Sequence, residues 1–186
     1  MFIRQNCCRF CPFNKTIILF IPFFSWCQNY QEGVRLFETK KLESAKTVFL
    51  RIPENSSNYL KAKEYIGDIA AYQKKWDKAL SYYEFLLKKD MLNAVYHYKY
   101  GGVLAYKAQS SNKLKALTLV GDIKKYLHKA AELDKNHIEV RWALVEVYIS
   151  LPSIVGGSEE KAKEYANELL QLSPVDGYLA LGYVAE

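Results

Sequence analysis

Small and apolar residues recur along the chain with a period of about 34 residues. Gly33, Gly67 and Gly101 are each separated by this interval, within stretches whose apolar pattern is helical. A glycine inside a helix costs roughly 1 kcal/mol relative to alanine, so a periodic one indicates that two helices approach closely there. Because periods of about 20 to 50 residues are typical of stacked repeats, the pattern predicts a repeat architecture.

The second half of each period carries a small residue and then an aromatic one. Ala45 and Ala79 are one period apart, as are Phe49 and Tyr83. Each alanine comes twelve residues after a periodic glycine, where a second helix would cross the first, and each aromatic lies one turn further on the same face. Each unit is therefore predicted to be a helical hairpin.

The period divides the chain after residue 27 into units at approximately 28–59, 60–93, 94–137 and 138–176, followed by a partial unit at 177–186. The third unit has about ten extra residues around Ser110 to Leu119, counted against the repeat length, which lengthen its first or its second helix. The fourth has Val145 at the glycine position and an insertion at 151–157. Residues 177–186 are predicted to form the opening helix of a fifth unit.

Several positions recur in register through these units. They are Gly33, Ala45, Phe49 and Pro53; Gly67, Trp76, Ala79, Tyr83 and Leu86; Tyr100, Gly101, Leu104, Leu127, Ala130, Leu133 and Asp134; Trp142, Leu144, Tyr148, Ala162, Leu169 and Pro174; and Tyr178, Leu181, Gly182 and Ala185. This pattern resembles the tetratricopeptide repeat family across nearly all of the chain after residue 27. The resemblance implies an all-α fold, a right-handed α-solenoid of about four stacked helical hairpins and a partial fifth helix.

The first 27 residues differ from the rest. Arg4, Arg9 and Lys15 occur without any acid before an apolar stretch at 16–26, which is typical of a secretory signal peptide. The stretch is about half of the roughly 20 residues that a membrane span needs. We expect cleavage after Cys27 and an exported, periplasmic or secreted protein. A lipid-modified Cys27 is the alternative, although the bulky Trp26 fits poorly where lipoprotein signals carry a small residue.

Processing after Cys27 changes what the composition implies. All four cysteines lie in the segment that is removed, at Cys7, Cys8, Cys11 and Cys27, so the mature chain has no disulfide, and no second pair completes a zinc site. The net charge falls from +6 to +3 because the segment holds three basic residues and no acid. The remaining lysines alternate with acids, which does not favour nucleic-acid binding. Membrane contact is expected only if the leader is retained or Cys27 is lipidated.

The sequence contains no catalytic constellation, and we expect neither enzymatic activity nor a cofactor. His97, His128 and His137 are isolated on helical patterns and lack metal-ligand spacing. His97 falls where the resembled family has a packing aromatic. Gly156 and Gly157 precede Ser158, but Glu159 and Glu160 would repel a phosphate at this helix start, so the segment is interpreted as a turn with Ser158 as the N-cap.

The resemblance also implies an inner surface formed by one face of each first helix. The mapped positions are Tyr30, Val34, Phe37, Lys61, Glu64, Asp68, Tyr72, Val95, Tyr98, Tyr106, Trp142 and Glu146. Aromatic residues dominate this set, and an exposed apolar concavity is an interaction surface. The alternative, open for each aromatic, is that it packs between neighbouring repeats. Glu64 and Asp68 argue against the chaperone-adaptor subgroup, which grips a terminal carboxylate with Lys, Asn and Arg.

We therefore expect a non-catalytic scaffold that holds a protein or peptide with apolar anchors and some basic residues in a groove of the cell envelope. The alternative is a solute-binding or accessory component of an envelope transport system. The insertion at 151–157 resembles one in exported bacterial tetratricopeptide proteins, some of them associated with transporters. A closed pocket would favour this alternative, and an open groove the scaffold.

Overall fold

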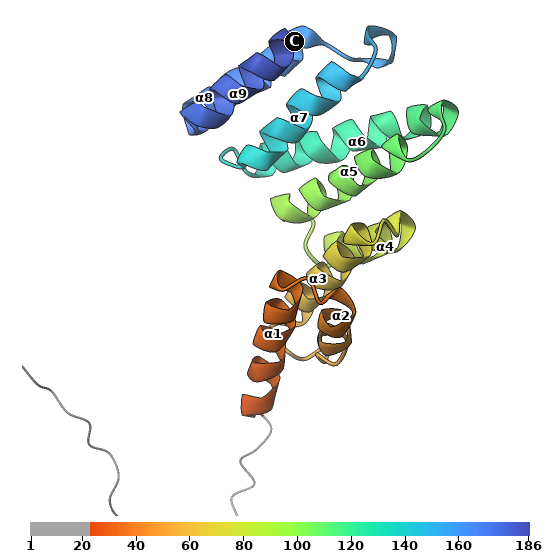
Figure 1. Cartoon of the computed structure of the whole chain (residues 1–186), viewed down its shortest axis with the longest axis vertical. Coiled ribbons are helices and arrows are strands. Elements are labelled where there is room, and N and C mark those ends of the chain that lie inside the picture. Colours follow the sequence, from red (N-terminus) through yellow and green to blue (C-terminus); the bar gives the residue numbers. More distant parts are fainter. Residues whose placement is uncertain (1–22) are drawn as a thin grey trace, which may run out of the picture.

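A computed structural model describes residues 23–186, which contain nine α-helices and one short 3₁₀ helix and no strand (Figure 1). The helices are α1 (Phe23–Glu38), α2 (Leu42–Leu50), α3 (Tyr59–Tyr72), α4 (Trp76–Lys89), α5 (Ala94–Gln109), α6 (Lys113–Leu133), α7 (Ile138–Ser150), η1 (Ser153–Val155), α8 (Glu159–Leu172) and α9 (Pro174–Ala185).

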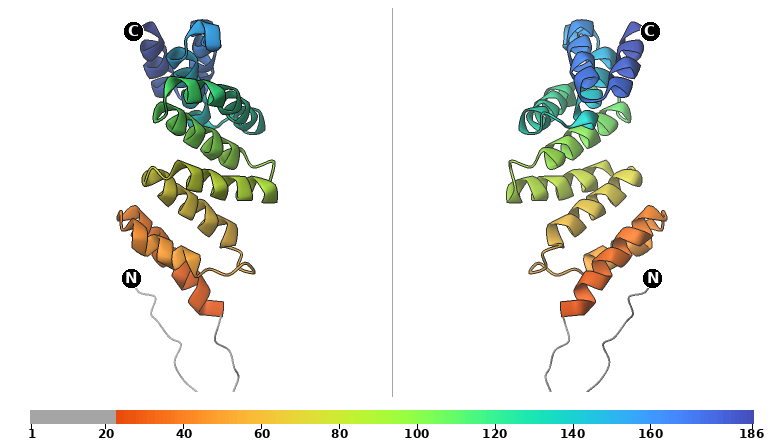
Figure 2. Two further views of the ribbon diagram at one scale, coloured as in Figure 1. Left: turned by 90° about the vertical axis from the view of Figure 1, so that its right-hand side faces the viewer. Right: turned by 90° about the vertical axis from the view of Figure 1, so that its left-hand side faces the viewer.

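Consecutive helices pair into hairpins that stack along one axis, with α1 at one end and α9 at the other (Figures 1 and 2). The pairs are α1 with α2, α3 with α4, α5 with α6 and α7 with α8, and the second helix of each pair also contacts the first helix of the next. Helix α9 packs on α8 and α7, as the opening helix of a further unit would. The predicted fold class, an all-α solenoid of helical hairpins, is confirmed.

At each periodic glycine, a side chain from the second helix of the hairpin packs directly against the backbone of the first helix. A Cβ atom added at Gly33 would lie 2.6 Å from the ring of Phe49, and one at Gly67 would lie 2.9 Å from the ring of Tyr83. At Gly101 the corresponding neighbour is Leu127, at 3.1 Å. The close approach predicted from the spacing is thus present in three successive hairpins, and a side chain at these positions would push the helices apart.

The link within the first two hairpins has a repeated geometry. Lys40 and Lys74 follow α1 and α3 with φ angles of 60° and 56°. The next residue in each case donates its backbone N–H to the helix just ended, Lys41 to Leu36 at 2.9 Å and Lys75 to Ala70 at 2.9 Å. A residue in the left-handed conformation directs the N–H groups after a helix toward its last carbonyl groups, which accept hydrogen bonds from them, and it reverses the direction of the chain.

The extra residues of the third unit lengthen its second helix. Helix α6 has 21 residues, whereas α4 and α8 have 14 each. Leu114 and Leu117, near its start, are exposed. The additional turns therefore reach beyond the core of the stack, and they form one wall of a hollow described below.

The insertion between α7 and α8 is an ordered turn. It contains η1, which is followed by Gly156, whose φ of 87° favours glycine. Ser158 then caps α8 by accepting a hydrogen bond from the N–H of Lys161 at 3.2 Å, as the sequence predicts. Lys124 of α6 donates to the carbonyl of Gly156, which ties the turn to the preceding hairpin.

The buried apolar side chains form two clusters. The smaller joins α1, α2 and the first part of α3 around Phe49 and Ile66, and the larger runs from the end of α3 to α9. Arg141 of α7 is also buried, and its guanidinium donates to the carbonyls of Asp134, at 2.7 Å, and His137, at 3.2 Å. The two clusters meet at α3, between Ile69 and Ala70.

Residues 1–22 lie outside the described part of the chain, and with them most of the predicted leader and three of its cysteines, Cys7, Cys8 and Cys11. Helix α1 begins at Phe23 and passes through the predicted cleavage point after Cys27. Among the described helices, none combines the length and the apolar character that a membrane crossing requires.

Candidate functional site

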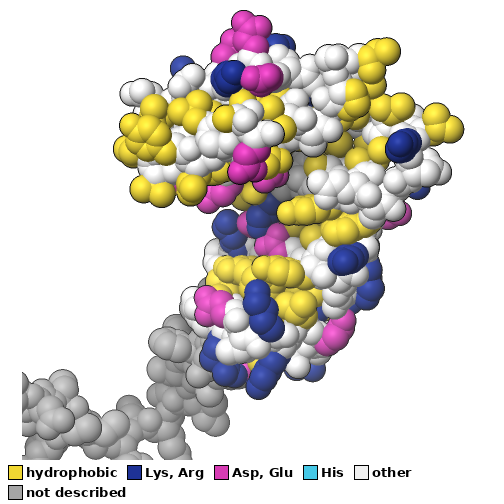
Figure 3. Space-filling model, turned by 45° about the horizontal axis from the view of Figure 1, so that its top comes forward, with side chains coloured by type: hydrophobic (Ala, Val, Ile, Leu, Met, Phe, Trp, Pro, Cys, Tyr) yellow, Lys and Arg dark blue, Asp and Glu magenta, His cyan; other side chains and the backbone are white. Residues whose placement is uncertain are grey.

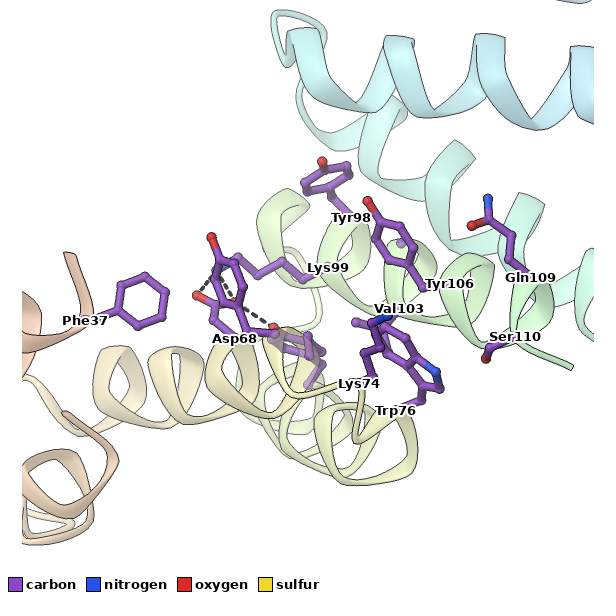
Figure 4. Close-up of a pocket in the computed structure, with 14 residues that line it drawn as sticks. Phe37, Asp68, Lys74, Trp76, Tyr98, Lys99, Val103, Tyr106, Gln109 and Ser110 are labelled. Atoms are coloured by element: carbon purple, nitrogen blue, oxygen red, sulfur yellow. Dashed lines mark hydrogen bonds and ion pairs between the residues drawn. The ribbon is translucent and has the colours of Figure 1, made fainter. Parts of the chain in front are cut away.

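A hollow of about 840 Å³, here the N-terminal hollow, lies between α1, α3, the start of α4 and α5 (Figure 4). It is open to solvent, and aromatic side chains from all four helices surround it. The aromatic residues that line it are Phe37, Tyr72, Trp76, Tyr83, Tyr98 and Tyr106. Figure 3 shows hydrophobic side chains exposed where the molecule narrows between its N-terminal and C-terminal parts.

Two aromatic contacts organise the walls of this hollow. The rings of Trp76 and Tyr106 stack at a centroid distance of 5.8 Å and an angle of 13°, which joins the start of α4 to the end of α5. Opposite them, the rings of Phe37 and Tyr72 meet edge to face at 5.7 Å, with the ammonium of Lys40 4.7 Å from the Tyr72 centroid. Tyr72 and Tyr106 remain 57% and 58% exposed, so each offers a large face to a ligand.

A second hollow, the C-terminal hollow of about 540 Å³, lies between α5, the lengthened start of α6 and α7. Ala116, Leu117 and Val120 of α6 form one wall, and Trp142 and Glu146 of α7 form the other. It is also open to solvent, and it exists in this form because α6 extends past the usual hairpin length.

The two hollows adjoin along α5. Tyr98, Gly102, Tyr106 and Gln109 of α5 line both of them. We call the combined surface the groove; it runs from Phe37 on α1 to Glu146 on α7. Adjoining hollows across successive first helices are suited to an extended ligand.

The two carboxylates of α3 are paired with a lysine of the next hairpin. The ammonium of Lys99 lies 2.7 Å from Glu64 Oε1 and 2.7 Å from Asp68 Oδ2. Tyr83 also donates its hydroxyl to Asp68 at 2.6 Å, and Lys61 lies 2.9 Å from Glu64. Burial disfavours the charged form of Glu64, but Lys99 and Lys61 outweigh it and hold the pKa of Glu64 below its usual value.

This pairing changes the charge that a ligand would meet. Lys99 is shared between Glu64 and Asp68, and Lys61 also pairs with Glu64, so two lysines meet the two carboxylates and the N-terminal hollow has little free negative charge. At the other end, Glu146 is exposed and makes no ion pair with any residue in the described range. Negative charge available to a ligand is therefore at the α7 end.

The structure separates the predicted groove residues into two groups. Those that line a hollow are Phe37, Asp68, Tyr72, Tyr98, Tyr106, Trp142 and Glu146. The other five line neither hollow: Tyr30, Val34, Lys61, Glu64 and Val95. Tyr30 packs against Phe49 and Tyr65 at centroid distances of 6.1 and 6.3 Å, and Val34 packs on the smaller core cluster. Glu64 is only 7% exposed. The alternative that an aromatic packs between neighbouring repeats thus describes Tyr30.

Several groove residues have no counterpart in the prediction, namely Lys74, Trp76, Lys99, Val103, Gln109 and Ser110. Trp76 belongs to a second helix and Lys74 to a link, so a rule that takes only first helices misses both. The period gives a partial signal, because Tyr72 and Tyr106 are 34 residues apart and Trp76 begins the helix that follows Tyr72.

Histidine side chains are used in packing. His128 of α6 lies between two tyrosines, its Nε2 2.8 Å from the Tyr148 hydroxyl and its Nδ1 3.0 Å from the Tyr165 hydroxyl. Burial, together with Lys161 and Lys124, lowers the pKa of His128, and burial with nearby Tyr148 raises the pKa of Tyr165 to about 12. Within residues 23–186 no group of His, Cys, Asp and Glu side chains is arranged to hold a metal ion.

Comparison with known proteins supports the fold. Neither the protein-family models nor the curated proteins match this sequence. Among solved structures, MamA from Desulfovibrio magneticus RS-1 is similar with a TM-score of 0.61 and 19% identity, covering 79% of this chain and 75% of that one. YrrB, described as a TPR protein with an unusual peptide-binding site, has a TM-score of 0.58 and 21% identity, covering 84% and 74%.

A third similar structure is the first TPR of Spaghetti (RPAP3) bound to the HSP90 peptide SRMEEVD, with a TM-score of 0.55 and 16% identity over 70% of this chain and 93% of that one. At these identities the likeness concerns the fold. The described residues therefore have the tetratricopeptide repeat fold.

Proposed function

We propose that this protein is a non-catalytic scaffold that binds a peptide or a protein segment in the groove. The observation that carries the proposal is that two open hollows adjoin at Tyr98 and Tyr106 and expose aromatic side chains to solvent. Rigid aromatic side chains offer large contact area at low entropy cost, and a preformed groove reduces the ordering cost of binding. Two proteins of the same fold bind peptides: YrrB has an unusual peptide-binding site, and the first TPR of RPAP3 binds the HSP90 peptide SRMEEVD.

The side chains of the groove favour a partner of particular chemistry. Its apolar anchors would enter the N-terminal hollow, against Tyr72, Trp76 and Tyr106. A basic residue would lie at the α7 end near Glu146, where the unpaired carboxylate is. Lys99 is already held by two carboxylates, so it is poorly placed to bind the terminal carboxylate of an acidic tail.

The proposed setting is the cell envelope. Its support is the sequence of the first 27 residues, basic and then apolar, which is typical of an export signal. The alternative function, a solute-binding component of a transport system, is expected to have a closed pocket, whereas both hollows are open to solvent. The openness supports the scaffold.

The test is a peptide-binding measurement with matched variants. A random-peptide display library is selected on the purified chain, and the selected peptides are measured by fluorescence anisotropy. We expect apolar and aromatic anchors with a basic residue, and at least a tenfold weaker Kd, about 1.4 kcal/mol, for the double variant Tyr72→Ala, Tyr106→Ala. Both side chains are more than half exposed, so this variant should keep its fold.

Leu92→Ala is the control, because Leu92 is 74% exposed and lines neither hollow. Equal binding by the double variant and the wild type would place the ligand elsewhere and contradict the proposal. Capture from a native envelope fraction with wild type and with a Tyr72, Tyr98 and Trp142 to alanine variant would then identify the natural partner.

A further inference from the structure

Two hairpin tips expose apolar side chains at one edge of the stack. Leu114 and Leu117, three residues apart at the start of α6, are 79% and 46% exposed. Ile154 of η1, at the tip of the next hairpin, is 92% exposed. Both tips project on the same side of the molecule, on the right in Figure 1. None of the three side chains belongs to either core cluster, so all three are available to a partner.

The tips of the second, third and fourth hairpins lie next to one another along this edge. Lys74, in the link between α3 and α4, and Ser110, in the link between α5 and α6, line the N-terminal hollow together. Leu117 and Leu151, the residue after α7, line the C-terminal hollow together. We call this row of tips the tip edge, and we define it by its exposed residues Lys74, Lys75, Lys113, Leu114, Lys115, Leu117 and Ile154.

Lysines flank the exposed leucines of α6. No acidic residue lies between Asp90 and Asp122, so the end of α5 and the start of α6 hold basic charge only. Lys113 and Lys115 lie on either side of Leu114 in the sequence, and neither forms an ion pair with a residue of the described range. Their charges are therefore free to attract an anionic partner.

The tip of the second hairpin adds further positive charge. Lys74 and Lys75 are exposed, and no ion pair holds either of them within residues 23–186. Asp77, which follows them at the start of α4, is paired with Lys107 of α5. Figure 3 shows hydrophobic side chains next to Lys or Arg along the right-hand edge of the molecule. The tip edge thus combines exposed apolar side chains with lysines whose charge the described chain does not neutralise.

Exposed apolar residues at the other end of α5 have a different setting. Met91 and Leu92, in the link between α4 and α5, are 72% and 74% exposed. Asp90 directly precedes them, and its carboxylate accepts a hydrogen bond from the N–H of Leu92 at 3.2 Å. An anionic surface would therefore meet a carboxylate at this link, whereas the tip edge around Leu114 offers ammonium groups.

We propose that the tip edge docks on a membrane surface that contains anionic lipids. Leu114 and Ile154 enter the headgroup region, with Leu117 at its margin, and the four lysines of the edge contact lipid phosphates. Apolar side chains beside basic ones bind such surfaces through buried apolar area together with electrostatic attraction, and each lysine extends its ammonium to the phosphates on a flexible stem. A row of projecting tips can meet a flat bilayer, whereas a concave groove cannot.

This docking is separate from the other contacts expected of the chain. It requires neither a retained leader nor a lipidated Cys27, the two conditions under which the sequence predicts membrane contact. Lys113, Leu114, Lys115 and Ile154 line neither hollow, so docking is also independent of the peptide binding proposed above.

The test is binding of the purified full chain to lipid vesicles, in reducing buffer because the first 27 residues hold four cysteines. Co-sedimentation compares vesicles of phosphatidylcholine with vesicles in which about one third of the lipid is phosphatidylglycerol. We expect at least tenfold tighter binding to the anionic vesicles, and weaker binding as salt is added.

Two double variants separate the apolar and the charged contributions. Leu114→Gln with Ile154→Gln, and Lys113→Gln with Lys115→Gln, should each weaken binding to anionic vesicles at least tenfold. All four side chains are exposed, so both variants should keep their fold, which circular dichroism checks. The matched control carries two glutamines at equally exposed apolar positions of the α4–α5 link and should bind like the wild type; its substitutions are Met91→Gln and Leu92→Gln.

Hydrogen exchange locates the contact whatever the leader does. With anionic vesicles, amides at 110–118 and 151–157 should exchange more slowly, and those of the α4–α5 link should be unchanged. Unaltered exchange at the tip edge, vesicle binding that neither double variant weakens, or equal binding to neutral and anionic vesicles would each overturn the proposal. Binding through the leader would appear as slowing confined to residues 1–27, and use of the edge by an acidic protein as failure to bind vesicles; both results also overturn it.

Discussion

At the residue scale, single side chains set the distance between helices and the charge of the groove. Gly67 and Gly102 are both helical, yet only the first faces a buried ring: an added Cβ would lie 2.9 Å from Tyr83 at Gly67 and would meet nothing within 4 Å at Gly102. The same substitution should therefore have opposite effects at the two positions.

We expect Gly67→Ala to lower the free energy of unfolding by about 1–3 kcal/mol, because Tyr83 is buried, hydrogen-bonded to Asp68 at 2.6 Å and unable to move aside. Gly102→Ala should raise it by about 0.5–1 kcal/mol through helix propensity. Urea unfolding followed by circular dichroism measures both. Equal effects of the two substitutions would contradict the role assigned to the periodic glycine.

Lys99 gives a second prediction. Lys99→Met leaves Glu64, only 7% exposed, without its main partner and should cost about 3 kcal/mol at pH 7. The same change at Lys107, whose partner Asp77 is exposed, should cost no more than about 1 kcal/mol. Comparable losses of unfolding free energy in the two variants would show that the buried ion pairs between α3 and α5 stabilise the fold no more than an exposed one.

The penalty of Lys99→Met should also depend on pH. The pKa of Glu64 is lowered in the fold, so its stabilising contribution is present above the unfolded pKa and is lost as the pH falls through the folded pKa. In the variant the buried carboxyl takes up a proton more readily. We therefore expect the difference in unfolding free energy between wild type and Lys99→Met to shrink from pH 7 to pH 4; a constant difference would argue against this origin.

At the element scale, the lengthened α6 both lines the groove and contacts the next hairpin. Its added turns form a wall of the C-terminal hollow, and its later turns carry His128, which joins α6 to Tyr148 of α7 and Tyr165 of α8. Lys124 of α6 also holds the turn at Gly156. The lengthened helix therefore connects the third and fourth hairpins through polar contacts where the insertion interrupts the regular repeat.

The His128 contact predicts a pH dependence. Burial, Lys161 and Lys124 lower its folded pKa below the unfolded value of about 6.5, so the unfolded chain binds more protons as the pH falls from 7 to 5. The wild type should lose stability over this range more steeply than His128→Gln, by at most about 1.4 kcal/mol per pH unit for one proton. Urea unfolding at several pH values measures the slopes, with His97→Gln as the control; parallel curves for wild type and His128→Gln would contradict the expectation.

At the scale of the whole molecule, the chain is a stack with two apolar clusters that meet at α3. In such arrays each hairpin is stabilised mainly by its neighbours, so distant parts can open separately. The cluster formed by α1, α2 and α3 is the smaller, and it lies at one end of the stack (Figure 1).

We expect Phe49→Ala, which removes a ring from the smaller cluster, to cost about 3–5 kcal/mol of local stability. Hydrogen exchange should then show faster exchange of amides in α1 and α2, with those in α8 unchanged. Leu127→Ala, in the larger cluster, should instead accelerate exchange in α8. Loss of protection in every helix after Phe49→Ala would show that the stack unfolds as one unit.

The repeat pattern by itself determined the fold class, because the glycine, alanine and aromatic positions that define a hairpin lie within half a period of each other and recur in register. The same reasoning predicted Ser158 as the cap of α8 and seven of the residues that line the groove. These features follow from local helix geometry, which the spacing of residues encodes directly.

Only the tertiary structure decided which of the predicted apolar and charged residues remain exposed and free to contact a ligand. Tyr30 and Tyr72 occupy similar faces of first helices, but Tyr30 packs against Phe49 and Tyr65 while Tyr72 stays exposed. Glu64 and Asp68 looked like free carboxylates until Lys99, from the next hairpin, was placed between them. Helical periodicity says which way a side chain points along its own helix; the angle between hairpins decides whether a neighbour covers it.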